Sequence, residues 1–330
     1  MFREVLEEAK EWARILHCSY VSDLNAIIES GNIGDLIRVS EALHEKKIAN
    51  IADHIANGIA DNRLILIAGP SSSGKTSFAQ RLKVQLMVMG LRPVSVSIDN
   101  YFVNRLDTPK LPDGNYDFES IDAVDTELFN EQLWSLLNGE KVLTPIYDFK
   151  KGIREFDFGT EVQIGMDQPI IVEGIHGLNE KLTSAIPRGN KFKIYVSALN
   201  QLNMDENTRI STSRVRLLRR IVRDYRTRGR SASSTILQWP NVRAGEEKYI
   251  FPYQDDADVM FNSALIYELG ALKHFAMYML AEIDPDNPTF EKGQELLAFC
   301  RNFKSIYDAK DIPSNSLIRE FIGGSCFNVS

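Results

Sequence analysis

The stretch Leu64-Ile-Leu-Ile-Ala-Gly-Pro-Ser-Ser-Ser-Gly-Lys-Thr-Ser77 decides the fold of this chain. Five apolar residues typical of a buried strand lead into a loop that fits the pattern G-x-x-x-x-G-K-[ST]. A helical pattern follows at once, over residues 77–89. In this strand–loop–helix context the loop turns its backbone N–H groups toward an anion at the positive end of the helix dipole. The sequence therefore predicts a phosphate-binding loop.

We expect this loop to hold the phosphates of ATP. The Lys75 ammonium would reach the β- and γ-phosphates, and the Thr76 hydroxyl would ligate Mg²⁺. The alternative is a flexible Ser/Gly linker, which the flanking strand and helix disfavour. The expected nucleotide contacts are Gly69, Ser71, Ser72, Ser73, Gly74, Lys75, Thr76 and Ser77.

Composition limits the class of protein. The chain has 330 residues, of which 44% are hydrophobic and 25% charged, as expected for a globular protein of about two domains. A net charge of −7 disfavours a general nucleic-acid surface. The three scattered cysteines fit reduced thiols and a cytoplasmic location. The charged N-terminus is unlike a secretory signal and no apolar run approaches transmembrane length, so no membrane partner is expected.

The hydrophobic pattern changes twice along the chain. Residues 1–60 predict a helical N-terminal extension, residues 61–263 a nucleotide-binding core, and residues 264–330 a C-terminal helical extension. Alternating strands and helices in the core predict an α/β fold of the P-loop NTPase type, with a mostly parallel sheet and helices on both faces. The segment 100–167 is too long for a simple crossover and is interpreted as a substrate-binding insertion. The expected strands are Leu64–Ala68, Val94–Ile98, Ile170–Val172, Phe192–Val196 and Val259–Phe261, and the expected C-terminal helices are 265–283, 290–307 and 312–324.

Two expected strands end on acidic residues, Asp99 and Glu173. Strand ends of a parallel sheet meet at one edge, so both carboxylates would lie near the γ-phosphate. Asp99 could accept a proton from an attacking hydroxyl, and Thr76, Asp99 and Glu173 could hold Mg²⁺. The alternative is that Asp99 caps a turn and Glu173 is a surface acid.

Nine arginines lie between Arg209 and Arg230, with no lysine and a single acid, Asp224. Arg216, Arg219 and Arg220 share one helical face with Arg223. Guanidinium groups match phosphate oxygens well, so residues 209–240 predict a lid that closes over the transferring phosphates. A solvated basic helix and an RNA-binding patch are the alternatives.

Five motifs follow one another along the chain: the phosphate loop, Ile98-Asp-Asn-Tyr-Phe102, Pro145-Ile-Tyr-Asp-Phe149, Ile171-Val-Glu-Gly174 and the arginine-rich Arg219–Arg230. In this order they resemble the uridine kinase/phosphoribulokinase family over residues 64–262. The resemblance implies a P-loop kinase that transfers the γ-phosphoryl group of ATP to a primary hydroxyl of a small-molecule acceptor, typically the 5′-hydroxyl of a nucleoside. Some bacterial members look like fusions with an aminoacyl-tRNA-synthetase-like region, of which residues 1–60 could be a remnant.

The resemblance also implies roles for single residues. Asp99 corresponds to the catalytic base and acts with Lys75, while Arg220, Arg223 and Arg228 correspond to lid arginines around the phosphates. Tyr147 and Phe149 match aromatic residues that flank the nucleobase. The expected acceptor contacts are Tyr101, Asp117, Glu119, Tyr147, Phe149, Arg154, Arg230 and Gln238.

Two departures from the family pattern leave the acceptor open. Gly152 stands where a histidine commonly reads the base, and Glu119 stands where an aspartate grips the ribose, with Asp117 as the alternative. A uridine- or cytidine-like nucleoside is the favoured acceptor. A non-nucleoside acceptor such as pantothenate or a sugar phosphate is the alternative within the class, and an RNA-associated regulatory ATPase is the alternative outside it. The C-terminal helices could form a contact in a homo-oligomer.

Overall fold

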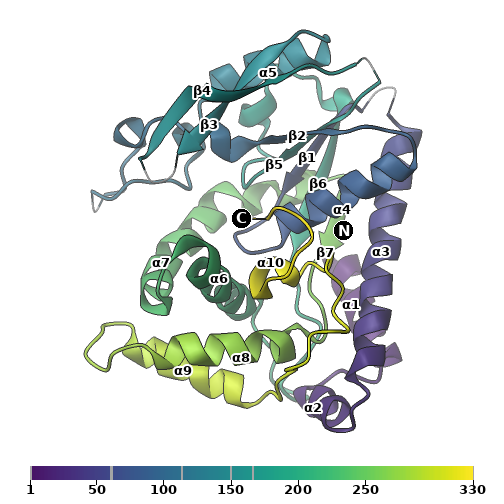
Figure 1. The fold of residues 1–330 in the computed structure, drawn as a ribbon, viewed down its shortest axis with the longest axis vertical. Helices are drawn as coiled ribbons and strands as arrows, with labels where there is room; N and C mark the ends of the chain where they lie inside the picture. Colours follow the sequence, from purple (N-terminus) through teal and green to yellow (C-terminus); the bar gives the residue numbers. More distant parts are fainter. Residues whose placement is uncertain (1, 60–61, 113, 149–150, 166, 330) are drawn as a thin grey trace.

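The computed structural model describes residues 2–59, 62–112, 114–148, 151–165 and 167–329. Its centre is a five-stranded, entirely parallel sheet with the strand order β2-β5-β1-β6-β7 (Figure 1). The α/β prediction is therefore confirmed, and the expected strand limits agree to within one or two residues. The strands are β1 (Leu64–Ala68), β2 (Val94–Ser97), β5 (Ile170–Glu173), β6 (Lys191–Ser197) and β7 (Val259–Asn262).

The sheet is buried on both faces, as its apolar strands require. All five side chains of β1 are at most 1% exposed. Leu64 and Leu66 belong to the core on the side of α5 (Thr126–Leu137), whereas Ile65 and Ile67 face α3 (Ile33–Asn57) and α4 (Lys75–Val88). The sheet can therefore fix the loops at its carboxyl edge.

The segment between β2 and β5 forms a separate layer beside the sheet, at the top of Figure 1. It contains α5 and an antiparallel hairpin of β3 (Val142–Asp148) and β4 (Ile153–Val162), whose register shifts between Thr144 and Ile146. Three short 3₁₀ turns connect it to the sheet, η1 (Ile98–Tyr101), η2 (Arg105–Asp107) and η3 (Ile121–Ala123).

A second hydrophobic core joins helices from both ends of the chain. The helix expected over 290–307 ends at Arg301, where the Asn302 side chain donates to the carbonyls of Ala298 and Phe299. The helix expected over 312–324 is only Arg319–Ile322, because residues 313–318 form turns that begin at Pro313. The remaining helices are α1 (Phe2–Ile15), α2 (Val21–Glu29), α6 (Thr212–Arg228), α7 (Ala232–Tyr249), α8 (Glu268–Ala281), α9 (Phe290–Arg301) and α10 (Arg319–Ile322), with the 3₁₀ turns η4 (Glu180–Thr183), η5 (Arg188–Asn190) and η6 (Phe251–Asp256).

A buried polar cluster ties α3 to the rest of the protein. The Glu41 carboxylate accepts hydrogen bonds from the Tyr267 hydroxyl at 2.6 Å and the Ser316 hydroxyl at 2.5 Å. Arg81 of α4, only 3% exposed, lies 3.6 Å from Glu41 and 2.6 Å from Glu45. Four segments distant in sequence therefore meet beside the helix that follows the phosphate loop.

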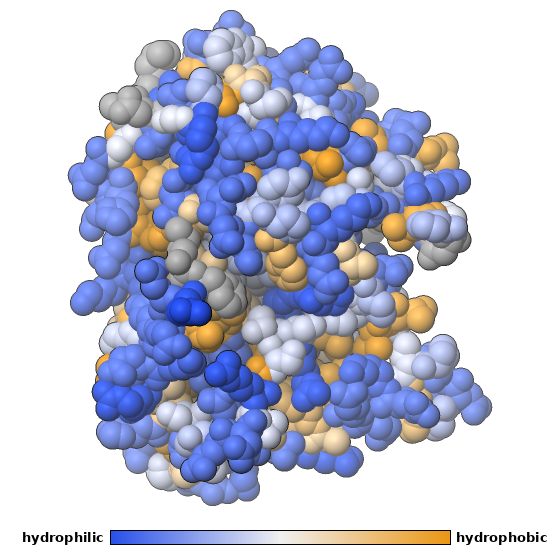
Figure 2. Space-filling view, turned by 180° about the vertical axis from the view of Figure 1, so that it is seen from behind, coloured by the Kyte–Doolittle hydropathy of each residue, from blue (hydrophilic) through white to orange (hydrophobic). Residues whose placement is uncertain are grey.

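The surface is mostly hydrophilic on the face seen in Figure 2, with hydrophobic residues in small groups. Among the described residues, no helix combines the length and the apolar character that a membrane span needs.

Candidate active site

The phosphate loop lies between β1 and α4, and its shape depends on two glycines. A Cβ on Gly69 would lie 2.2 Å from the carbonyl oxygen of Val196, so no side chain fits there. Gly74 precedes α4 with φ +85°, a left-handed conformation that glycine adopts without strain. These constraints allow the loop to curl tightly against β6 before α4 begins.

Groups suited to anion binding gather in this loop. The Lys75 ammonium donates to the carbonyls of Gly69 at 3.0 Å and Pro70 at 3.2 Å. The hydroxyls of Ser72 and Ser73 are buried and have no hydrogen-bond partner within the described part of the chain. Buried hydroxyls without partners are costly, and phosphate oxygens would satisfy them.

The two predicted carboxylates lie at the same edge of the sheet. Glu173 pairs in register with Ile67 on one side and with Ser97 on the other, so the chain reaches Asp99 two residues beyond that level. Charge coupling links Asp99 to Lys75, and Lys75 to Glu173. The structure thus brings together the three groups that the sequence singled out.

Loss of hydration perturbs all three groups. It raises the pKa of Glu173 to about 7, an effect that Lys75 opposes and Asp99 reinforces. The Asp99 carboxylate is still accessible to solvent, but surrounding protein displaces enough water to raise its pKa against the attraction of Lys75. Loss of hydration also lowers the pKa of Lys75, against the attraction of Glu173.

The donor set fits a hard divalent cation. The Thr76 hydroxyl donates to Glu173 at 3.1 Å, and Asp99 is coupled to the same carboxylate, so all the candidate ligands are oxygens. Across the described residues there is no cluster of three or more acidic, histidine or cysteine side chains able to hold a metal. Mg²⁺ usually binds through one or two protein ligands, water and substrate phosphates, which these residues could provide.

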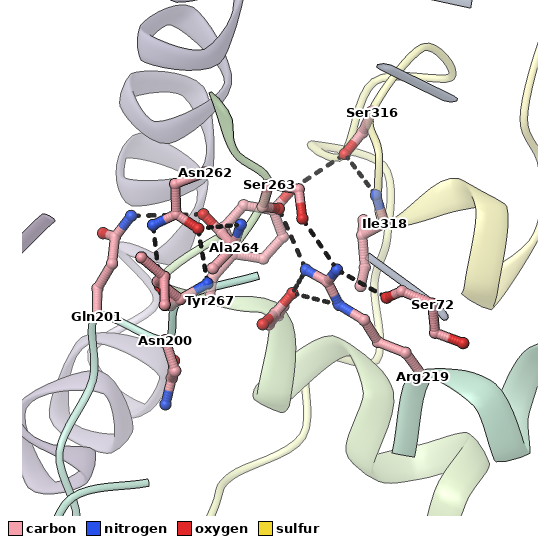
Figure 3. A network of polar contacts seen from close by, with 12 residues as sticks. Ser72, Asn200, Gln201, Arg219, Asn262, Ser263, Ala264, Tyr267, Ser316 and Ile318 are labelled. Carbon is pink, nitrogen blue, oxygen red and sulfur yellow. Dashed lines mark hydrogen bonds and ion pairs between the residues drawn. The ribbon is translucent and has the colours of Figure 1, made fainter. Parts of the chain in front are cut away.

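Two buried arginines of α6 contact the backbone of the phosphate loop and do not face a ligand. Arg216 forms two hydrogen bonds of 2.6 Å to the buried Glu246, whose carboxylate also accepts the backbone N–H of Ser71 at 3.0 Å. Arg219 pairs with Glu268 and donates to the carbonyl of Ser72 at 3.3 Å (Figure 3). Both guanidiniums are at most 2% exposed, so they brace the loop.

The predicted lid arginines cluster around one acid. Arg220 donates to the Ser71 hydroxyl at 2.8 Å and lies 3.3 Å from Asp224, which also binds Arg223 at 2.8 Å. Arg228 lies 3.7 Å from Asp224 and is coupled to Asp99. Arg220 therefore contacts the phosphate loop, Arg223 and Arg228 act electrostatically on Asp99, and Asp224 partly neutralises these cations.

The predicted acceptor residues are placed less uniformly. Tyr147 is buried. Tyr101 is buried as well, and its hydroxyl donates a hydrogen bond to Gln132 of α5 at 2.7 Å. Phe149 lies outside the described residues. Three other predicted residues have partners within the protein. Arg154 binds Asp125 at 2.8 Å, and Arg230 and Gln238 bind each other at 2.6 Å.

The two candidate acceptor carboxylates differ in their surroundings. Asp117 accepts a hydrogen bond from the Tyr249 hydroxyl at 3.0 Å. Glu119 is coupled to Arg220 and Lys75, and loss of hydration raises its pKa to about 7. It packs on α7 where a Cβ at Gly245 would lie 2.5 Å from the Glu119 Cβ. Glu119 therefore interacts electrostatically with cations at the phosphate loop. The bare backbone of Gly245 in α7 leaves room for its side chain.

Sequence reasoning missed Glu246, Gly245 and Glu320. Glu320 of α10 accepts the backbone N–H of Ser77 at 3.3 Å and its hydroxyl at 2.8 Å. Each residue lies more than 100 positions from its partner and belongs to no local motif. The sole sequence signal is that Glu246 belongs to the helix that follows the arginine-rich one.

The chain is similar in sequence to known proteins. A family model for the phosphoribulokinase/uridine kinase family matches residues 64–267. A uridine kinase of Mycoplasma genitalium is 33% identical over 182 residues, which are 55% of this chain and 75% of that protein. A uridine kinase of Borrelia hermsii is 30% identical over 228 residues, covering 66% of this chain and 92% of that protein. A solved structure from Bacillus stearothermophilus, described as a possible uridine kinase, superposes with a TM-score of 0.45 and 18% identity over 66% of this chain and all of that one.

Replacing the buried Glu246 by glutamine should destabilise the protein. The change removes one charge of a buried pair and leaves the Arg216 cation uncompensated, so the free energy of unfolding should fall by about 3 kcal/mol in urea titrations. The adjacent Glu247→Gln is the matched control, because Glu247 is exposed and its ion pair with Arg243 should contribute less than about 0.5 kcal/mol. Equal effects of the two substitutions would contradict a bracing role for Glu246.

The raised pKa of Glu173 predicts a pH dependence of stability. The folded protein keeps a proton on Glu173 up to about pH 7, whereas the unfolded chain releases it near 4.5, so this residue makes the fold less stable as pH rises between these values. Relative to wild type, Glu173→Gln should therefore gain stability from pH 4.5 to 7, measured as the difference in free energy of unfolding. Glu173→Asp keeps a titrating carboxyl group and should behave more like wild type, and a pH-independent difference for Glu173→Gln would disprove the assignment.

Proposed function

The chain belongs to the phosphoribulokinase/uridine kinase family, and on that premise we propose that it is an ATP-dependent kinase that phosphorylates the 5′-hydroxyl of a nucleoside. The observation that carries the proposal is the coupling of the Asp99 carboxylate to the Lys75 ammonium at the carboxyl edge of the sheet. A carboxylate beside this lysine can accept the proton of an acceptor hydroxyl.

The proposed chemistry assigns one task to each group. Asp99 accepts the proton of the acceptor hydroxyl, and its raised pKa makes it a better base than an ordinary aspartate. Lys75 and the cations of Arg223 and Arg228 stabilise the charge on the transferring phosphoryl group. Thr76 and Glu173 would hold Mg²⁺, which neutralises phosphate charge when bound.

On the acceptor side we assign the hydroxyl-binding carboxylate to Glu119 and a structural role to Asp117. Asp117 already accepts a hydrogen bond from Tyr249. Among the described residues, no side chain donates a hydrogen bond to the Glu119 carboxylate. A carboxylate that accepts two hydroxyl groups suits a vicinal diol such as that of ribose. Tyr147, buried within strand β3 of the hairpin, would flank the base.

One observation favours the second candidate, a kinase for an anionic acceptor such as a sugar phosphate. A Cβ on Gly152 would lie 2.6 Å from the guanidinium carbon of Arg105, so Arg105 fills the space next to this residue. Its charge reaches Tyr147, the proposed base-flanking ring. A permanent cation at this place would attract a phosphate or carboxylate on the acceptor. A panel of nucleosides, sugar phosphates and pantothenate, followed by ADP release, separates the two candidates.

Asp99→Asn should abolish transfer without preventing nucleotide binding. Removal of the base should lower kcat by about 10²- to 10⁴-fold, whereas the Kd of ATP should change by less than about threefold. Asp107→Asn, an exposed acid of the following turn, is the control and should leave kcat unchanged. Wild-type turnover by the Asp99 variant would remove this residue from the mechanism.

Glu119→Gln should raise the KM of the acceptor by about tenfold or more, because a hydrogen bond to a charged group is lost. Tyr249→Phe removes the partner of Asp117 and should change that KM by less than about threefold, with kcat unaffected. Steady-state kinetics with the best acceptor of the panel measures both. A large effect of Tyr249→Phe together with a small effect of Glu119→Gln would reverse the assignment of the two carboxylates.

A further inference from the structure

We propose that the C-terminal segment 316–322 is an intramolecular competitor of the nucleotide: its Glu320 carboxylate occupies an anion position of the phosphate loop and must withdraw when ATP binds. The inference rests on the proposed function only in requiring that the loop binds a nucleotide.

The contact lies where a phosphate is expected. The first N–H groups of a helix have no partner within the helix, and the phosphate-loop motif uses them to bind phosphate oxygens. Ser77 is the third residue of α4, and its N–H and hydroxyl both donate to the same oxygen of Glu320. The side chains are buried, Ser77 at 1% and Glu320 at 6% exposure, so water does not compete for them. A carboxylate on these donors takes the place of a phosphate oxygen.

The charge of Glu320 extends over the rest of the site. It opposes the lowering of the Lys75 pKa and adds to the raised pKa of Glu173. The phosphates of ATP would bring several negative charges to the same donors, and like charges a few ångströms apart repel strongly outside bulk water. Nucleotide and Glu320 therefore exclude each other at Ser77.

The neighbouring residues close over the loop as well. The Leu317 side chain lies 3.0 Å from the place of a Cβ on Gly74, so it covers the residue that precedes α4. Ser316 is tied to Tyr267, next to the contacts of Arg219 with Ser72 and Ser263 (Figure 3). The segment thus lies on the same network that braces the phosphate loop.

The arginine-rich helix α6 anchors this segment. Arg226 donates to the carbonyl of Phe321 at 2.7 Å, and the Arg219 guanidinium lies 5.0 Å from the centre of the Phe321 ring. A movement of α6 toward bound phosphates would change both contacts. Helix α6 would then give up its contacts with the C-terminal segment and contact the nucleotide.

Glu320→Gln tests the competition directly, because glutamine keeps the shape and a carbonyl that accepts from Ser77 but lacks the charge. The Kd of ATP, measured by titration calorimetry without acceptor, should fall by about tenfold. Arg226→Ala, which loosens the anchor, should also lower it. Glu291→Gln, an exposed acid of α9, is the control and should leave the Kd unchanged. An unchanged or higher Kd for Glu320→Gln would overturn the proposal.

Hydrogen–deuterium exchange provides a second readout. Addition of ATP to the wild-type protein should accelerate amide exchange in residues 316–322 as the segment withdraws. Slower exchange there would mean that the segment joins the nucleotide site, which rejects competition. Neither measurement involves an acceptor, so ATP binding without nucleoside phosphorylation would contradict the proposed function and leave this inference standing.

Discussion

The arrangement of the site depends on one buried ion pair, between Glu246 of α7 and Arg216 of α6. The Glu246 carboxylate is fully buried and accepts the N–H of Ser71 as well as both ends of the Arg216 guanidinium. Two charges removed from water are tolerated only when their hydrogen bonds are satisfied, so each group confines the others. The phosphate loop is thereby fixed to two helices that come more than 140 residues later in the chain.

Helix α7 also links the two halves of the site. Within five residues it provides Glu246 for the phosphate loop, the bare backbone of Gly245 for Glu119, and Tyr249 for Asp117. The neighbouring His176 ring packs edge-on against Tyr249, and burial lowers its pKa to about 4, so this histidine is neutral near physiological pH. The proposed donor and acceptor positions are therefore held by the same helix.

The sequence pattern predicted the features that depend on residues close together in the chain. The strands around Leu64 and Ile170 are continuous apolar runs, and Gly74 with its positive φ fits the local turn into α4, whereas the constraint on Gly69 comes from the distant Val196. The arginine-rich segment was correctly predicted as a helix, but its arginines have two different surroundings. Arg216 and Arg219 are buried against acids from α7 and α8, and only tertiary contacts separate them from Arg223 and Arg228. Glu320 could not be predicted for the same reason, since its partner lies 243 residues away.

The cluster around Arg81 has a consequence for the evolution of this fold. That guanidinium belongs to the helix that carries the phosphate loop, yet its carboxylate partners, Glu41 and Glu45, come from α3. In a protein that began at β1, no α3 would cover Arg81, so its guanidinium would lie in water instead of in a buried cluster. The burial of this cation therefore depends on the N-terminal helix. Loss of a carboxylate on α3 would leave a buried charge without its partner, so the two parts of the chain have to change together at this point.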